Sequence, residues 1–584
     1  MNTLKKLLFL LSTEERKSAV ILIIIIIITS LLDVLGVASV LPFLTVIINP
    51  NIVETNIFLK NMFEISNNFG VKNNQDFLFA LGLIVFVLLI LTLTLRALVA
   101  YLQAKFINMR IHTIGKNLVE GYLSQPYSWF ISQHSADFGK NILSEVDQVV
   151  VNGLKPMLEL FSKTITIITI VVLLLIIDPK MTLTVFSLLG GCYGLIYFLL
   201  KKFIAEVGQK RLLSNFLRFK VINDLFGAIK EVKARGLEQV YINYFSNPAK
   251  VFSKNLTYLQ ALSQLPRFFL EAFVFGGVLL VLLLDISRTD KFIDNIPLLS
   301  IYILAGYRLL PAIQQIYASS SKLVYIFPSL KKIVFDLKKN NIKNIHVYGK
   351  QNYFSLNKGI TLKNIEYSYP QASDTTLNNL NLTILAKSFV GFVGATGSGK
   401  TTTVDIIMGL LEPQKGTLEC DGKVIDRSNL KSWQGIVGYV PQNIFLMDDT
   451  VASNIAFGIE RKNIDQGLVE KAAKIAKIHD FVMSELKDKY QTVIGERGIK
   501  FSGGQRQRIG IARAVYFSPK LLILDESTNA LDNETALEVL NQIKNLSKNT
   551  TIILISHRQD QLKYCDKIFE FYKGHLKIPD NIIK

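Results

Sequence analysis

Residues 389–411 read FVGFVGATGSGKTTTVDIIMGLL, and they predict the fold of the C-terminal half. A short apolar run precedes the pattern GxxxxGK[ST] and a helix-forming run follows it, which predicts a strand, a tight loop and a helix. Glycines in such a loop let backbone N–H groups surround phosphates, and the helix dipole adds to the attraction. We therefore expect a nucleotide site, with Lys400 at the β- and γ-phosphates and Thr401 on Mg²⁺. The expected binding residues are Gly394, Ala395, Thr396, Gly397, Ser398, Gly399, Lys400, Thr401 and Thr402.

A second stretch, LLILDE at 521–526, joins an apolar strand to two acids. A strand that is apolar throughout is typical of the centre of a parallel sheet. Ligands of α/β sheets bind at the carboxyl ends of such strands, which is where the two carboxylates stand. We expect Asp525 to hold Mg²⁺, directly or through water, and Glu526 to act as general base on the attacking water. The two motifs predict a P-loop nucleotidase and do not choose among its families.

The N-terminal half has a different character. The chain has 584 residues, 50% of them are hydrophobic, and the mean hydropathy is +0.33. Six apolar runs are each long enough to cross a bilayer, which takes about 20 residues. These runs lie near 18–48, 77–105, 153–177, 181–200, 268–285 and 296–317.

The formal net charge of +19 would suggest nucleic acid as the partner of a soluble protein. In a membrane protein it fits cytoplasmic loops that face anionic lipid. Lysines and arginines gather between 201 and 254. The positive-inside rule therefore puts both termini and the 106–150 and 201–262 loops in the cytoplasm, and no nucleic-acid partner is expected.

Three regions follow from these patterns. We expect a six-helix transmembrane domain over 1–330, a basic, asparagine-rich linker over 331–357, and an α/β P-loop domain over 358–584. The membrane helices should extend into the cytosol, where short helices bridge them. The stretches 126–137 and 224–235 are candidates for these bridges, because both mix aromatic and charged residues, which favours a docking surface over a solvated loop.

Residues 501–508, FSGGQRQR, indicate which family of P-loop nucleotidases the chain resembles. They closely resemble the signature motif of ATP-binding-cassette proteins, with Phe501 where leucine is usual. The motif opens a helix, so it forms an anion-binding helix terminus. The resemblance implies that this terminus binds the γ-phosphate of ATP held by the opposite subunit, so two chains form a homodimer around two ATP molecules. The residues implied to act in trans are Ser502, Gly503, Gly504 and Gln505.

Other positions resemble the same family one by one. Tyr369 resembles the aromatic residue that stacks on adenine, and Gln442 the glutamine that contacts Mg²⁺ and water. His557 resembles the histidine that contacts the γ-phosphate. Residues 529–532, NALD, resemble the D-loop, with Asn529 in place of serine. The resemblance thus implies the catalytic residues Glu526, His557 and Gln442, and the Mg²⁺ ligands Thr401, Gln442 and Asp525.

The membrane half is similar to one exporter subgroup, the bacterial PglK-like flippases of lipid-linked oligosaccharides. The likeness lies in residues 7–16, 30–44, 265–275 and 304–316. Residues 57–65, IFLKNMFEI, are amphipathic and match the short external helix of that subgroup.

Arg308 lies within an apolar run, where a charge costs about 2.5–3.5 kcal/mol on insertion scales. It is expected to line a watery cavity, where a pyrophosphate-linked lipid would be its partner and Arg308 a substrate contact. An internal salt bridge to Glu271 or Asp33 is the alternative. Arg96 and Arg267 lie nearer the ends of their runs and are expected to snorkel.

The sequence as a whole predicts an ATP-hydrolysing exporter or flippase of the bacterial cytoplasmic membrane. Its cargo would be a lipid-linked oligosaccharide or a related lipid, and other lipids, drugs or peptides are the alternatives. An ATP-gated channel or a regulatory subunit would have a degraded Glu526 or signature, and both are intact. A cytosolic cassette protein is disfavoured by the six apolar runs.

Overall fold

The computed structural model describes residues 3–48, 50, 52–68, 71, 73–177, 179–288, 292–339, 354–370, 374–495 and 498–577. The chain divides into two compact units. The helical unit comprises Met1–Gln125 and Gln133–Ile345, and the nucleotide-binding unit comprises Pro126–Ser132 and His346–Lys584.

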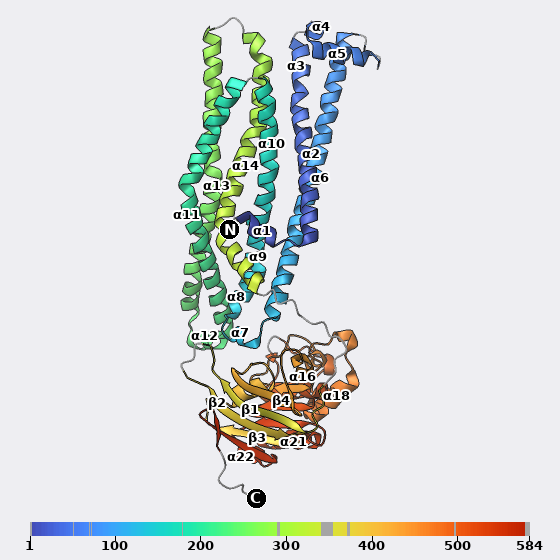
Figure 1. Cartoon of the computed structure of the whole chain (residues 1–584), viewed down its shortest axis with the longest axis vertical. Helices are drawn as coiled ribbons and strands as arrows, with labels where there is room; N and C mark the ends of the chain where they lie inside the picture. The colour runs from blue at the N-terminus through green and yellow to red at the C-terminus, as the bar shows by residue number, and fades with distance from the viewer. Residues whose placement is uncertain are drawn as a thin grey trace. The chain divides into compact units, whose positions relative to one another are not determined.

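The helical unit is built from long helices (Figure 1). Four of them have 48 to 51 residues, more than twice the length that crosses a bilayer, so each extends beyond the apolar run it contains. The elements are α1 (Thr3–Phe9), α2 (Thr13–Ala38), α3 (Val40–Ile48), α4 (Ile52–Thr55), α5 (Ile57–Asn67), α6 (Asn74–Leu123), α8 (Ser135–Gly139), α9 (Val146–Val149), α10 (Lys155–Ile177), α11 (Pro179–Gly227), α12 (Ile229–Arg235), α13 (Glu238–Arg288) and α14 (Phe292–Lys339), with the π-helical segments η1 (Lys140–Glu145) and η2 (Val150–Leu154).

All six predicted apolar runs fall on helices. Within the described residues, Asn74–Leu123 and Ser135–Ile176 are long and apolar enough to span a membrane. The run at 18–48 is not one helix, because α2 ends at Ala38 and α3 begins at Val40. Pro42 in the first turn of α3 has no N–H to continue the hydrogen bonding of α2, which explains the break.

The long helices pack side by side (Figure 1). Helix α14 contacts α10, α11 and α13, and α11 also contacts α13, while α2 packs against both α6 and α10. The predicted amphipathic segment forms α5, which buries Leu59 against Val46 and Phe77 and leaves Ile57 exposed. Of the two predicted bridges, residues 126–132 with α7 (Tyr127–Ile131) group with the nucleotide-binding unit, whereas 224–235, which includes α12, belongs to the helical unit.

The nucleotide-binding unit contains two sheets. An antiparallel sheet has the strand order β2-β1-β4-β5, and a second sheet has the order β10-β9-β3-β8-β7-β6, parallel from β9 to β6. The strands are β1 (Gly359–Tyr367), β2 (Leu377–Leu385), β3 (Phe389–Gly394), β4 (Lys415–Cys420), β5 (Lys423–Val424), β6 (Val437–Val440), β7 (Leu521–Asp525), β8 (Thr551–Ile555), β9 (Lys567–Tyr572) and β10 (His575–Lys577). The helices are α15 (Lys400–Ile407), α16 (Leu430–Gln434), α17 (Val451–Ile455), α18 (Gln466–Ile475), α19 (His479–Ser484), α20 (Gly503–Tyr516), α21 (Asn533–Leu546) and α22 (Gln559–Leu562), with 3₁₀ turns η3 (Arg461–Asn463) and η4 (Lys489–Gln491).

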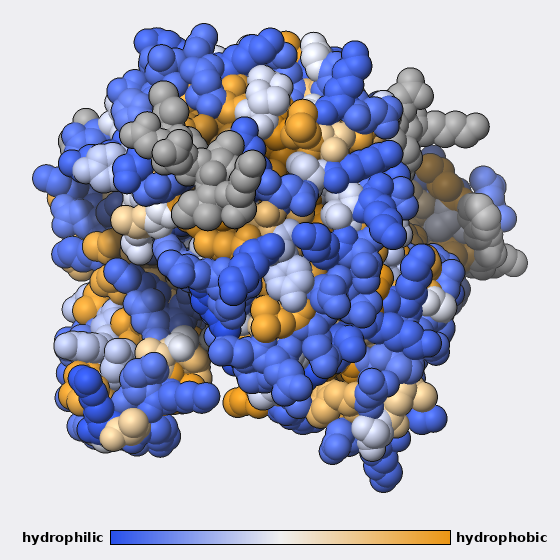
Figure 2. Space-filling view, turned by 90° about the horizontal axis from the view of Figure 1, so that it is seen from below, coloured by the Kyte–Doolittle hydropathy of each residue, from blue (hydrophilic) through white to orange (hydrophobic). Residues whose placement is uncertain are grey.

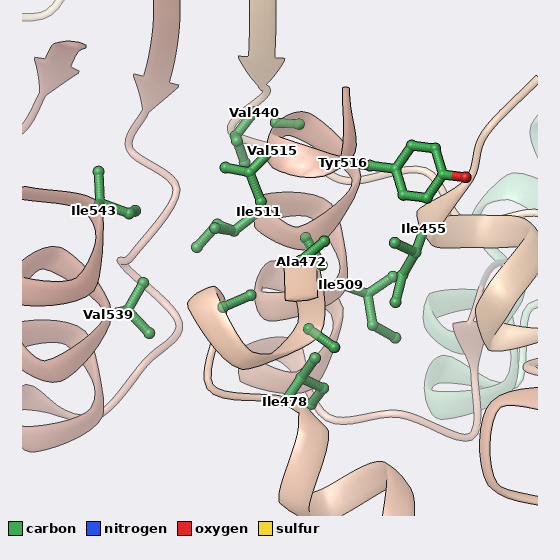
Figure 3. Close-up of a cluster of buried hydrophobic side chains, with 14 of the residues drawn as sticks. Val440, Ile455, Ala472, Ile478, Ile509, Ile511, Val515, Tyr516, Val539 and Ile543 are labelled. Carbon is green, nitrogen blue, oxygen red and sulfur yellow. The ribbon is translucent and has the colours of Figure 1, made fainter. Parts of the chain in front are cut away.

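A buried apolar cluster holds α20 in place (Figure 3). Ile511 and Val515 of α20 lie in the same cluster as Ala472 of α18, Val539 of α21 and Val440 of β6. This packing fixes the helix while Ser502 at its N-terminus stays exposed.

The face of the molecule seen in Figure 2 is mostly hydrophilic, with hydrophobic side chains gathered in small patches.

Candidate functional site

The order of the parallel strands brings four predicted motifs to one edge of the sheet. Strand β8 lies between β3 and β7, and β6 lies on the other side of β7. All four strands run parallel, so their carboxyl ends meet at the same edge. The residues that follow these ends are the glycine-rich loop after β3, Gln442 after β6, Glu526 after β7 and His557 after β8.

The loop between β3 and α15 has the conformation that its glycines permit. Gly394, Gly397 and Gly399 have φ of 147°, 78° and 103°, values that other residues rarely adopt. A side chain on Gly394 would collide with the Phe571 carbonyl. The loop residues Ala395 and Thr396 are exposed, as is Thr401 in the first turn of α15, while Ser398 and Thr402 are buried.

Lys400 turns back over the loop. Its Nζ donates hydrogen bonds to the carbonyls of Gly394 at 2.7 Å and Ala395 at 2.9 Å. Burial lowers the pKa of Lys400, while the charges of Glu526 and Asp525 act in the opposite direction. The ammonium therefore lies close to two carboxylates and within the loop, where phosphate oxygens can take over its hydrogen bonds.

Asp525 ends a fully buried strand, as predicted, and is itself only 6% exposed. Burial raises the pKa of Asp525, and the neighbouring charge of Glu526 raises it further. The Tyr439 hydroxyl is 3.5 Å from Asp525 Oδ2. A buried carboxylate beside a second acid gains stability from a bound divalent cation, so this residue fits Mg²⁺.

Three side chains converge on the Glu526 carboxylate. Gln442 Nε2 donates to Oε2 at 2.8 Å, and Asn529 Nδ2 donates to the same oxygen at 2.9 Å. His557 Nε2 lies 3.4 Å from the other oxygen, Oε1. The Glu526 backbone has φ of 47° and donates its N–H to the Ile555 carbonyl at 3.1 Å. A left-handed glutamate is unusual, and here it directs the carboxylate toward these partners.

The signature residues form a capping box at the start of α20. Ser502 N–H donates to Gln505 Oε1 at 2.8 Å, and Gln505 N–H donates to Ser502 Oγ at 3.2 Å. Gly503 and Gly504 lie against Ala530 of the predicted D-loop, and Gln507 accepts the Ala530 N–H at 2.9 Å. The signature and the D-loop are therefore parts of one packed surface.

The structure also shows the surroundings of Tyr369 and Phe501, two residues that the sequence analysis singled out. The Tyr369 hydroxyl lies 3.2 Å from Thr402 Oγ1, and its ring meets Tyr367 edge-on at 5.2 Å, so the ring is fixed beside the phosphate loop. Phe501, which replaces the usual leucine, is buried with its ring 6.0 Å from that of Phe481. The apolar core thus accommodates the larger side chain.

One acidic residue at the site was not predicted from the sequence. Asp405 of α15 is 9% exposed, and burial, followed by the charge of Asp525, raises its pKa to about 6. Its sequence signal is a single acid in the otherwise apolar run VDIIMGLL at 404–411, which can be found by looking for charges on a predicted core face. The hydrogen bond from Asn529 to Glu526 was also not predicted.

In the helical unit, the predicted arginines have different surroundings. Arg267 Nε donates to Glu271 Oε1 at 2.5 Å one turn along α13, so Arg267 forms an ion pair as well as reaching the surface. Arg308 is half-buried in α14, and Arg96 is exposed on α6. The side chain of Asp33, the other suggested partner of Arg308, lies outside the described residues.

A helical membrane region followed by a P-loop α/β domain defines the class of ATP-driven membrane transporters. Comparison with known families agrees: residues 377–529 match the model "ABC transporter", and residues 21–291 match the model "ABC transporter transmembrane region". The chain belongs to the ABC transporters and has the fold of an ABC exporter, in which ATP hydrolysis is coupled to transport. This confirms the predicted family and fold.

The chain is similar to several exporters along most of its length. It is 26% identical over 481 residues to an ATP-dependent lipid A-core flippase of Cupriavidus metallidurans, covering 82% of this chain and 80% of the relative. The identity to a flippase of the same name from Saccharophagus degradans is 28% over 493 residues, covering 81% and 80%. A bacterial Atm1-family ABC exporter with ATP bound has a similar structure, with a TM-score of 0.72, 19% identity and coverage of 96% and 94%.

Proposed function

We propose that this chain is one half of a homodimeric flippase that moves a lipid-linked oligosaccharide, or a related lipid, across a bacterial cytoplasmic membrane. The predicted boundary at 330 was too early, because α14 continues to Lys339; residues 1–339 would therefore form its membrane domain, the linker predicted over 331–357 would begin after Lys339, and 358–584 would form the ATPase. The observation that carries the proposal is the convergence of Gln442, Asn529 and His557 on Glu526, in a chain whose other half is a bundle of long apolar helices.

Hydrolysis follows from the two oxygens of the Glu526 carboxylate. Oε2 accepts hydrogen bonds from Gln442 and Asn529, which hold the carboxylate in one orientation. Oε1 then takes the proton of the attacking water. The water oxygen bonds to the γ-phosphorus of ATP as the bond to the β-phosphate oxygen breaks, and Lys400 neutralises charge on the phosphates.

The residues present fit a magnesium ion. Thr401, Gln442 and Asp525 offer a hydroxyl, an amide and a carboxylate, which are oxygen donors of the kind Mg²⁺ prefers. When bound, Mg²⁺ would neutralise charge developing on the β- and γ-phosphates. His557, near Oε1 of Glu526, would contact the γ-phosphate itself.

The signature implies a partner chain. Ser502, Gly503, Gly504 and Gln505 would bind the γ-phosphate held by the opposite subunit, with the helix dipole of α20 favouring the negative charge. ATP would then bind better to the closed pair than to the open pair, and so shift the transporter between two states. Loss of the γ-phosphate would remove that preference and let the pair open.

The cargo is inferred from two independent sources. The membrane half resembles flippases of lipid-linked oligosaccharides, and two relatives carry the name lipid A-core flippase. Both names describe amphipathic glycolipids, so a lipid A-like glycolipid is the second candidate. Arg308 is the proposed contact to an anionic headgroup, for which a phosphate or pyrophosphate would supply the charge.

Reconstitution into liposomes tests this function. A fluorescent polyprenyl-pyrophosphate oligosaccharide and a fluorescent lipid A-core would be placed in separate vesicle preparations, and ATP-dependent loss of quenching would report flipping. We expect the oligosaccharide lipid to move and the Glu526→Gln variant to move neither lipid. Flipping of lipid A-core alone would show that the cargo is a lipid A-like glycolipid and not a lipid-linked oligosaccharide. If neither lipid is flipped while a drug or peptide is exported, the proposal of a lipid cargo is overturned.

A further inference from the structure

Outside the nucleotide-binding site, the helical unit buries an ion pair. Glu145, the last residue of η1, accepts hydrogen bonds from Arg211 Nη1 of α11 at 2.9 Å to each carboxylate oxygen. Both side chains are 0% exposed. Asn215, one turn further along α11, donates to Glu145 Oε1 at 2.7 Å. The carboxylate is therefore held by two side chains of the same helix.

The pair also engages a third helix. Arg211 Nη2 donates to Ser329 Oγ of α14 at 2.5 Å, and the guanidinium lies 5.6 Å from the centre of the Tyr325 ring. One turn before Arg211, a side chain on Gly208 would collide with the Tyr325 carbonyl. Helices α11 and α14 thus approach closely at Gly208, and the Arg211 side chain is fully buried between them and η1.

The π-helical segment η1 is anchored at its other turn as well. Asn141 Nδ2 donates to Asp336 Oδ2 of α14 at 3.1 Å and to the Tyr122 hydroxyl of α6 at 3.1 Å. Tyr122 itself donates to Asp336 Oδ2 at 2.7 Å. The short segment is therefore bonded to three long helices, and π-helical turns are rare and occur frequently at functional sites.

Stability alone does not account for a charge pair at this position. Desolvation offsets most of the attraction between buried charges, and well-packed apolar side chains of similar volume often replace such a pair without loss of stability. The pair offers direction instead, because the N–H groups of a planar guanidinium have fixed directions: Nη1 donates to both oxygens of Glu145 while Nη2 donates to Ser329. Its contribution is therefore to the relative position of η1, α11 and α14.

We propose that Glu145 and Arg211 are positioning residues that make η1, α11 and α14 move as one body when ATP binds. The inference rests on the proposed function, because it requires ATP-driven movement of the membrane helices. In the chain, η1 follows α8 and the Pro126–Ser132 segment that groups with the nucleotide-binding unit. Movement of that segment enters the helical unit at η1, and the ion pair passes it to α11 and α14.

The test measures helix movement and ATP hydrolysis in the same full-length protein. A spin label at Pro179→Cys, at the exposed start of α11, reports the distance between the α11 helices of the two chains of the dimer, in a background with the exposed Cys192 changed to serine. Distances would be compared without nucleotide and with ATP and vanadate. The variants are Glu145→Gln and the apolar pair Glu145→Met with Arg211→Met, and the matched control is Glu120→Gln, which removes the exposed Lys116–Glu120 pair.

We expect the apolar pair to keep the wild-type melting temperature and basal ATPase rate and to lose most of the ATP-dependent distance change. Glu145→Gln should lose the same change, and the Glu120→Gln control should keep it. A wild-type distance change in the apolar pair would overturn the inference, since the ion pair would then be structural only. Absence of both ATPase and movement in the unmodified protein would instead contradict the proposed function.

Discussion

The two units of this protein place their polar chemistry in different ways. In the nucleotide-binding unit, the functional side chains stand on loops at one edge of a sheet, each in a short motif. In the helical unit, the buried polar contacts join residues on helical segments far apart in the sequence, such as Glu145 with Arg211 and Tyr122 with Asp336, which are 66 and 214 positions apart. A motif carries a mechanism in its local spacing, whereas a pair of distant helix positions carries none until the helices are packed. Substitutions in each unit should therefore separate the chemistry of the first unit from the coupling in the second.

Glu526→Gln should have the largest effect on the nucleotide-binding unit. The amide keeps the shape of the side chain but cannot take a proton from water, so steady-state ATPase should fall by about 10²-fold or more. ATP affinity, measured by equilibrium binding of a fluorescent analogue, should change little. An ATPase rate near wild type would exclude Glu526 as the base.

Arg308→Ala should affect transport by the helical unit and leave ATP hydrolysis by the nucleotide-binding unit intact. Transport of the pyrophosphate-linked lipid is expected to disappear because the headgroup loses its cation, while basal ATPase stays close to wild type. Vesicle flipping and phosphate release would be measured on the same preparation. If folding and ATPase collapse together with transport, Arg308 is a structural residue.

Asn529→Ala removes one of the two hydrogen bonds to Glu526 Oε2 and leaves that from Gln442. One such bond contributes about 1 kcal/mol, so ATPase should fall by roughly fivefold, far less than for Glu526→Gln. Asn529→Ser, the residue usual in the family, is the matched control. A loss as large as that of Glu526→Gln would show that Asn529 does more than orient the base.

Asp405→Asn should give a pH-dependent gain in stability. The pKa of Asp405 is raised to about 6, so the folded state favours the neutral acid, and the stability this contributes is lost as pH rises through that value. Asparagine stays neutral throughout. The melting temperature of the variant minus that of wild type, measured without nucleotide, should therefore grow between about pH 4 and about pH 7. A difference that is constant with pH would contradict the assigned ionisation.

Phe501→Leu should have the smallest effect. It restores the residue usual in the signature at a buried position, and because it removes ring atoms from the core it should cost about 0.5–3 kcal/mol of unfolding free energy. ATPase should stay near wild type because the Ser502–Gln505 capping box does not involve the Phe501 side chain. A large loss of ATPase, measured beside thermal denaturation, would indicate that the aromatic ring positions the signature.

The sequence predicted most of the nucleotide-binding unit because its strand–loop–helix order and its glycines are local features. It predicted Glu526 from the end of an apolar strand and placed Gln442 and His557 at the same site through family resemblance, and the strand order gives the physical reason. It did not predict Asp405 or the Glu526–Asn529 bond, which depend on how α15 and the D-loop face the sheet. In the helical unit it predicted the helices but not the break at Ser39 or the buried Glu145–Arg211 pair, because hydropathy carries no information about which distant residues meet.

Binding of each ATP between two chains is the arrangement on which the proposed dimer depends. It can be tested with Thr396→Cys in the phosphate loop of one chain and Ser502→Cys in the signature of another, both exposed positions. Both chains would carry the substitutions Cys192→Ser and Glu526→Gln, and each chain would have a purification tag of a different size. The two chains would be co-expressed and then mildly oxidised with or without ATP. We expect a disulfide-linked heterodimer that forms with ATP and not in its absence. Failure of ATP to produce this cross-link, in a protein that binds ATP with normal affinity, would show that ATP is not bound between the two chains.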